Sequence, residues 1–111
     1  MSLTRRRWTE RQHLEHAEAK LRKFNAQGGL CYCCTRAHAS PLTMEWAHRI
    51  ADTKANRKVF GRAVIDHPLN GVLVCAEDRA GRNCNSAVLL NWAAADAHAA
   101  RIREAIERGA K

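Results

Sequence analysis

Four cysteines in two pairs are the residues of this chain whose types and spacing best predict chemistry. Two residues separate Cys31 from Cys34, and eight separate Cys75 from Cys84. Two pairs of thiolates can close a tetrahedral zinc site, and a structural zinc of this kind contributes directly to folding. The sequence therefore predicts a structural Zn²⁺ held by these four cysteines. The two-residue spacing leaves Cys33 outside the ligand set.

The composition also favours a stabilising metal. The chain has 111 residues, of which only 5% are aromatic, and alanine supplies much of the 46% hydrophobic fraction. A core this lean commonly needs a metal or a partner chain. The sequence contains no apolar run near the roughly 18 residues of a membrane span and no signal-like apolar stretch at its start. We therefore expect an intracellular protein, in which clustered cysteines are more often metal ligands than disulfides.

The charge of the chain predicts a polyanionic partner. The formal net charge is +8 and the pI is near 9.9. A balance this basic is typical of nucleic-acid-binding proteins, although it cannot choose between DNA and RNA.

The elements that would position the cysteines begin with a helix. Residues 1–8 carry three successive arginines and are expected to form a mobile basic arm, because like charges repel. Thr9 and Gln12 have the spacing of a capping box, and Gly28 and Gly29 suit a left-handed helix end. The expected apolar stripe of this helix consists of Leu14, Ala17, Leu21 and Phe24.

Short strands and loops are expected between the two cysteine pairs. The predicted strands are 43–47, which leads into His48, then 63–65 and 72–74. A polar, basic loop over 51–62 and a turn over 66–71 would connect them.

The last part of the chain predicts a long helix. Residues 76–83 are expected to form an exposed loop, and Asn85 with Ser86 would cap a helix that runs to Arg108. Trp46 and Trp92 are expected in the core. The apolar side of the helix would consist of Val88, Leu89, Trp92, Ala95 or Ala99, Ile102 and Ile106.

The central stretch resembles the HNH endonuclease family, particularly its phage and restriction-associated members. The resemblance is carried by the first cysteine pair, by Ala47-His48-Arg49-Ile50, by the five-residue step from Asn70 to Cys75, and by Cys84-Asn85. It covers about residues 30–92. It implies an α+β fold with a zinc-stabilised ββα-metal core over 30–111, preceded by a basic arm and N-terminal helix over 1–29.

The resemblance also implies catalytic roles. His48 would be the general base that activates a water, for which a neutral imidazole is suited. Asn70 would orient the His48 ring or brace the loop that presents it. Asn85 would bind the catalytic ion, Mg²⁺ or Mn²⁺, through its carbonyl oxygen.

One position departs from the family pattern. Ala47 stands where the family commonly has a metal-ligating Asp or His. Glu45, two positions earlier on the same strand face, is the first candidate to replace it. Asp66 and His67 are further candidates.

The implied partner is DNA, expected as a duplex. The phosphate contacts would come from Arg49, Lys54, Arg57, Lys58 and Arg62. Phosphate contacts carry no base information, so we expect loose sequence preference. Cutting both strands would suggest two active sites, in a homodimer or a larger nuclease complex, with the C-terminal helix as a candidate dimer surface. The resemblance places the protein in the cytoplasm of a bacterium or of a phage-infected cell.

Several of these residues could instead have simpler roles. His48 could complete a Cys₃His zinc site, Asn70 could be a turn residue, and Asn85 could be a helix cap. The chain could accordingly be a zinc-knuckle nucleic-acid-binding module without catalysis. It could also be a zinc-stabilised protein adaptor that docks through its alanine-rich helix.

Overall fold

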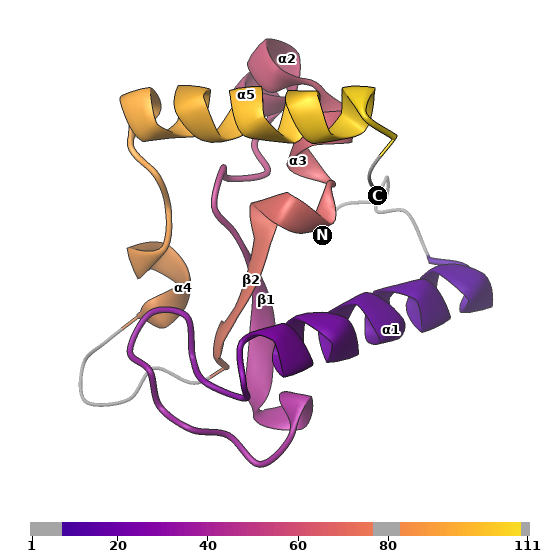
Figure 1. Cartoon of the computed structure of the whole chain (residues 1–111), viewed down its shortest axis with the longest axis vertical. Coiled ribbons are helices and arrows are strands. Elements are labelled where there is room, and N and C mark those ends of the chain that lie inside the picture. The colour runs from indigo at the N-terminus through magenta and orange to yellow at the C-terminus, as the bar shows by residue number, and fades with distance from the viewer. Residues whose placement is uncertain (1–7, 77–82, 110–111) are drawn as a thin grey trace, which may run out of the picture.

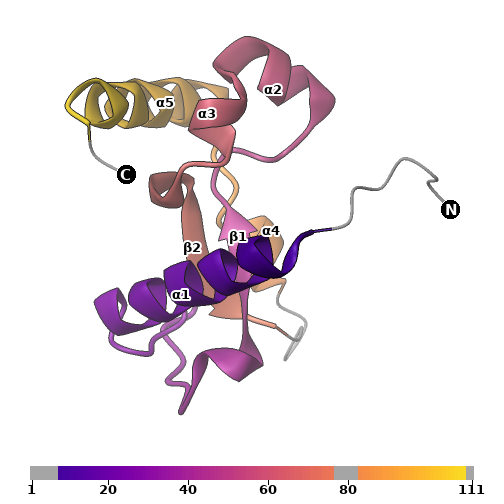
Figure 2. The ribbon, with the colours of Figure 1, turned by 90° about the vertical axis from the view of Figure 1, so that its right-hand side faces the viewer.

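The computed structural model describes residues 8–76 and 83–109 as a small α+β fold built on a two-stranded antiparallel sheet (Figure 1). Strand β1 (Met44–His48) pairs with β2 (Gly71–Cys75). Helix α1 (Glu10–Ala26) crosses the sheet, and α5 (Trp92–Glu107) lies across its far end (Figures 1 and 2). The expected basic arm before Trp8, and most of the expected loop within the second cysteine pair, lie outside the described residues.

Helix α1 begins and ends as predicted, but it packs through a different face. The Thr9–Gln12 capping box is present, and Gly28 and Gly29 both have positive φ. The predicted apolar stripe is wrong, because Leu14 and Leu21 are 61% and 50% exposed. Phe24 is the member of the stripe that packs against the core. The helix turns its other partly buried side chains inward: His16, Ala19, Lys20 and Lys23.

The predicted strands 43–47 and 72–74 correspond to β1 and β2. Trp46 faces Leu73 across the ladder and His48 faces Gly71. A 3₁₀ turn, η1 (Pro41–Thr43), leads into β1. The apolar residues of β2 are buried with the cysteines in what we call the cysteine core: Cys31, Met44, Ala47, Val72, Leu73, Val74, Cys75, Cys84 and Val88.

The connection between the strands is helical, which corrects two predictions. The expected loop over 51–62 contains α2 (Lys54–Phe60), whose N-cap Thr53 accepts a hydrogen bond from the backbone of Asn56. The expected strand over 63–65 is the short helix α3 (Arg62–Ile65). Gly61 joins the two helices with a φ of 90°, a conformation that suits only glycine. A 3₁₀ turn, η2 (Pro68–Asn70), then leads into β2.

The predicted long C-terminal helix is two helices. Helix α4 (Cys84–Ala87) is capped by Asn83, and α5 is capped by Asn91. The chain leaves the helical path between them, where the backbone N–H of Leu90 donates to the carbonyl of Arg49. Trp92 is 64% exposed, so the prediction that it lies in the core is wrong.

Helix α5 covers a second apolar cluster, which we call the helical core: Ile50, Phe60, Val64, Ile65, Ala95, Ala99 and Ile102. It lies at the end of the sheet where β1 ends and β2 begins (Figure 1). Among the helices in the described ranges, none has the length and apolar character needed to span a membrane.

Candidate functional site

The four predicted zinc ligands lie together. The Sγ atoms of Cys31, Cys34, Cys75 and Cys84 are all within 4.8 Å of one another, and those of Cys34 and Cys75 are 3.7 Å apart. Zn–S bonds of about 2.3 Å in a tetrahedron place two sulfurs about 3.8 Å apart. The cluster can therefore hold a metal ion such as Zn²⁺. Cys33 is partly buried beside this core and is not one of the four.

A tight turn presents the first cysteine pair. The N–H of Thr35 donates to the carbonyl of Cys31, and the N–H of Cys34 points at the Cys31 sulfur, 3.4 Å away. Thr35 has a φ of 63°, an uncommon conformation for a β-branched residue. The N–H of Tyr32 donates to Leu73 in β2, which joins the turn to the sheet.

The thiols differ in acidity without a metal. Burial would raise the pKa of Cys31, but hydrogen bonds from backbone N–H groups, chiefly that of Cys34, lower it to about 7. Burial, with the neighbouring Cys34 and Cys31 side chains, raises the pKa of Cys75 to about 11. Burial likewise raises the pKa of Cys84. Because a metal binds thiolates, binding at neutral pH must release protons.

His38 also belongs to this centre, although it is not among the ligands predicted from the sequence. Its Nε2 lies 3.2 Å from the Cys75 sulfur, and its Nδ1 lies 2.7 Å from the Thr43 hydroxyl. An N–H group at this position can donate to a metal-bound thiolate and orient it. The spacing Cys31-x₂-Cys34-x₃-His38 is the signal in the sequence that could have indicated this contact.

A second cluster lies at the end of β1, around His48. The ring of His48 and the carboxylates of Asp52 and Asp66 offer ligand atoms within 4.8 Å of one another. Asp52 follows β1 and Asp66 ends α3, so the helical connection brings them together. Asp66 was among the candidate ligands predicted from the sequence, whereas Asp52 was missed.

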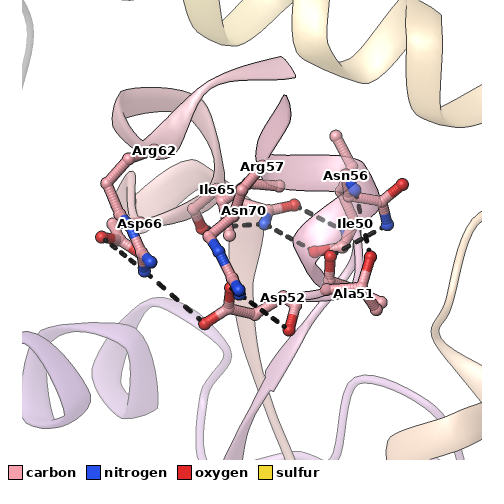
Figure 3. Close-up of polar contacts among 10 residues, drawn as sticks. Ile50, Ala51, Asp52, Asn56, Arg57, Arg62, Ile65, Asp66 and Asn70 are labelled. Atoms are coloured by element: carbon pink, nitrogen blue, oxygen red, sulfur yellow. Dashed lines mark hydrogen bonds and ion pairs between the residues drawn. The ribbon is translucent and has the colours of Figure 1, made fainter. Parts of the chain in front are cut away.

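Two arginines bind these carboxylates (Figure 3). Arg57 lies 2.5 Å from Asp52, and Arg62 lies 3.4 Å from Asp66 and 3.8 Å from Asp52. The arginine and aspartate side chains are between 33% and 59% exposed. Exposed pairs of this kind are worth roughly 0–1 kcal/mol each, so a cation or a phosphate can compete for either partner.

Asn70 braces the segment that follows His48. Its fully buried side chain donates to the carbonyls of Ile50 and Ile65, at 3.1 and 2.9 Å, and accepts from the N–H of Ile50 at 2.8 Å (Figure 3). The backbone carbonyl of Asn70 accepts a hydrogen bond from the N–H of Arg49. These contacts hold the segment after His48 to the end of α3, and the expected role of Asn70 in presenting His48 stays a prediction.

The structure pairs Asn85 with Glu45, two residues that had both been predicted to bind the catalytic ion. The Asn85 amide donates to the Glu45 carboxylate at 3.1 Å, which joins α4 to β1. Ala47 is buried and offers no ligand. The acidic partners gathered at His48 are instead Asp52 and Asp66.

The five expected phosphate-binding residues have different surroundings. The Arg49 side chain is used internally, because it donates to the Val88 carbonyl and the Tyr32 hydroxyl. Lys54 and Lys58 are exposed on α2. Arg57 and Arg62 lie in the ion pairs described above.

A groove of about 790 Å³ separates α1 from β1 and contains the His48 cluster. Aromatic rings line its α1 side: the His16 ring lies 5.1 Å from that of Trp8 and 5.8 Å from that of Trp46, both edge to face. The Trp46 indole lies against the backbone of Gly71, where an added Cβ would be only 1.9 Å from the ring. His16 and Trp46 are therefore fixed in the groove.

Comparison of the chain with protein-family models, with curated proteins and with solved structures finds no significant match in any of the three.

Proposed function

We propose that this chain is a metal-dependent endonuclease of the HNH type that hydrolyses DNA phosphodiester bonds with His48 as general base. The observation that carries the proposal is the grouping of His48 with Asp52 and Asp66 in a groove of a strongly basic protein. The order β1, β2, α4, with the cysteine cluster behind it, supports a zinc-stabilised ββα core.

The donor atoms at His48 suit a hard divalent cation. Carboxylate oxygens are the preferred ligands of Mg²⁺, and ligands on opposite sides of one ion are about 4.2 Å apart. The present spread of up to 4.8 Å needs only small side-chain movements. Four carboxylates line the groove (Glu15, Glu45, Asp52 and Asp66) against two cationic side chains (Lys20 and Arg62). The groove lining is thus more acidic than the chain as a whole, but at His48 the arginines Arg57 and Arg62 balance the two carboxylates, so a bound cation must take their place.

In this proposal each residue has a distinct role. Asp52 and Asp66 would hold Mg²⁺ or Mn²⁺, which when bound neutralises charge on the phosphate that is cut. His48 would accept the proton of the attacking water. Arg57 and Arg62, once released from the carboxylates, can donate to phosphate oxygens. Asn70 positions the chain after His48 and does not itself touch the substrate.

One observation favours the alternative of a nucleic-acid-binding module without catalysis. Ala47 cannot ligate an ion, and the amide of Asn85 is hydrogen-bonded to Glu45. A metal site built on Asn85 and Glu45 alone would have no ligand at position 47, next to His48. The two proposals therefore differ in whether Asp52 and Asp66 hold a metal that supports cleavage, or the chain binds nucleic acid without cutting it.

The decisive experiment is cleavage of supercoiled plasmid by zinc-loaded protein, with added Mg²⁺, with added Mn²⁺ and with neither. The variants are His48→Ala, the double variant Asp52→Asn/Asp66→Asn, Asn85→Ala, and Asp96→Asn on α5 as a matched control. We expect metal-dependent cleavage that falls by about 100-fold or more in His48→Ala, as for loss of a general base. The double variant should lose activity and require more Mg²⁺, whereas Asp96→Asn should behave as wild type.

Two other results would change this conclusion. Loss of cleavage in Asn85→Ala with full activity in the double variant would move the metal to Asn85 and Glu45. Absence of cleavage by zinc-loaded wild type in either metal, together with salt-dependent DNA binding, would establish the binding module instead.

A further inference from the structure

The groove beside α1 has aromatic side chains that the proposed hydrolysis does not use. Trp8, at the start of the helix, is 44% exposed, and its ring contacts the rings of His13 and His16 at 5.2 and 5.1 Å. Through His16 the aromatic row continues to Trp46 on β1. The row therefore runs along the groove from the helix to the strand that carries His48.

This row is held in place from both sides. Trp46 packs on the cysteine core and lies against Gly71, whose missing side chain makes room for the indole. The ammonium of Lys23 lies 5.8 Å from the Trp46 ring centre and donates to the carbonyl of Pro68. Burial, followed by the charges of Lys20 and His13, lowers the pKa of His16, which favours the neutral ring. His16 and Trp46 thus form a fixed aromatic wall in the groove, and Trp8 extends this wall with a ring that is 44% exposed.

Such a wall suits unpaired bases. In a duplex the base faces are stacked on one another, whereas single strands offer them to aromatic side chains. The groove volume of about 790 Å³ is within the range of about 300–1,000 Å³ typical of ligand sites. Lys20 lines the same groove and can contact the phosphate backbone. The groove lining itself has more carboxylates than cationic side chains, so the phosphate backbone also needs the cation proposed at Asp52 and Asp66, while the chain as a whole, at +8, attracts a polyanion.

We propose that the groove between α1 and β1 binds a single-stranded segment of nucleic acid, with an unpaired base stacked on Trp8 and the next phosphate directed toward His48. This inference rests on the proposed function, because it names the form of the substrate next to the cut. The substrate is then a duplex with an open or frayed segment, or a single strand, rather than fully paired DNA.

The test is equilibrium binding of a labelled oligothymidylate and of a fully paired hairpin to zinc-loaded protein in buffer with Ca²⁺ in place of Mg²⁺, because Ca²⁺ also takes oxygen ligands. Trp8→Ala is compared with Trp8→Phe, which keeps an aromatic face. Trp92→Ala is the matched control, because Trp92 is also exposed but lies on α5 against Phe60, away from the groove.

We expect Trp8→Ala to weaken oligothymidylate binding by about tenfold, the typical cost of one lost stacking platform. Hairpin binding should be unchanged, Trp8→Phe should bind nearly as wild type, and Trp92→Ala should have no effect. The inference is overturned if Trp8→Ala leaves oligothymidylate binding intact or weakens both ligands equally. The experiment measures binding and not cleavage, so its result can be interpreted even if the protein proves not to cleave DNA.

Discussion

The cysteine core and the helical core are similar in size but differ in what holds them together. The cysteine core contains four thiols able to ligate a metal, and its other members come mainly from the two strands. The helical core has no cysteine, and its apolar side chains come from α2, α3, α5 and the segment after β1. One core is therefore expected to depend on an ion, and the other on the fit of its side chains.

Two polar residues, Asn70 and Arg49, connect the two cores through their hydrogen bonds. Asn70 connects Ile50 and Ile65 of the helical core to the start of β2. Arg49 connects β1 to the turn before α5 and, through Tyr32, to the first cysteine pair. His48 lies at this junction. The catalytic geometry proposed above should therefore depend on the integrity of both cores.

Removal of the metal should produce the largest effect, and it should act first on the cysteine core. Structural zinc can contribute about 10 kcal/mol or more to folding. We expect Cys84→Ser, or chelation of the wild type, to abolish cooperative unfolding and expose Trp46. Intrinsic fluorescence and circular dichroism during zinc titration would measure this. Cys33→Ser is the control and should bind one zinc per chain, and equal losses in both variants would contradict the assigned ligand set.

Truncation within the helical core should weaken the fold without releasing the metal. Ile102 is fully buried, so Ile102→Ala should lower the free energy of unfolding by about 2–5 kcal/mol. Ile106→Ala, on the same helix but 37% exposed, should cost clearly less. Urea unfolding and zinc stoichiometry should be measured together. Loss of zinc from folded Ile102→Ala would show that the two cores are not separable.

Asn70→Ala should break the connection between the cores. It removes a fully buried side chain and leaves the Ile50 and Ile65 carbonyls and the Ile50 N–H without that partner. We expect a loss of about 2–3 kcal/mol in the free energy of unfolding, with weaker cleavage because the segment after His48 is released. Asn56→Ala, which removes a partly buried bond to Ala51, is the control for the loss of an amide. Similar effects of both substitutions would argue against a bracing role for Asn70.

The smallest expected effect is a pH dependence that originates at the helical core. Burial, followed by the charge of Arg49, lowers the pKa of His98 from its ordinary value of 6.5, and the ring Nε2 is buried without a hydrogen-bond partner. Below pH 6.5 the unfolded chain therefore binds a proton that the folded chain does not. Stability should fall as the pH drops below this value, until the folded pKa is reached. His98→Gln should reduce the difference between urea midpoints at pH 7.5 and pH 6.0, and an unchanged difference would exclude His98 as the source.

The parts of the fold that were predictable depend on short-range signals. The capping box of α1, the apolar run of β2 and the paired cysteines are each contained within a few residues. The helices α2 and α3 were missed for opposite reasons. The residues of α2 are polar and give little periodicity, while the β-branched Val64 and Ile65 favour a strand locally. Packing of Phe60, Val64 and Ile65 beneath α5 decides the conformation instead.

The candidate site was predictable only in part for a similar reason. His48 was found because it lies in a recognisable local pattern, and Asp66 because it lies near Asn70 in sequence. Asp52 has no such pattern, and it meets Asp66 only after the chain has passed through two helices. The break before α5 had a local signal that was overlooked, because Asn91 stands in front of Trp92 as a helix cap.

The connection from Arg49 to Asn70 has a consequence for the order of folding. The two strands pair only when this whole connection is closed, and its two helices contribute to the helical core. Closing a connection costs entropy that later contacts must recover, which slows chains with distant pairings. The thiols of Cys34 and Cys75, 41 residues apart, come together across the same closure. Zinc should therefore join its second pair of ligands late, when this connection closes.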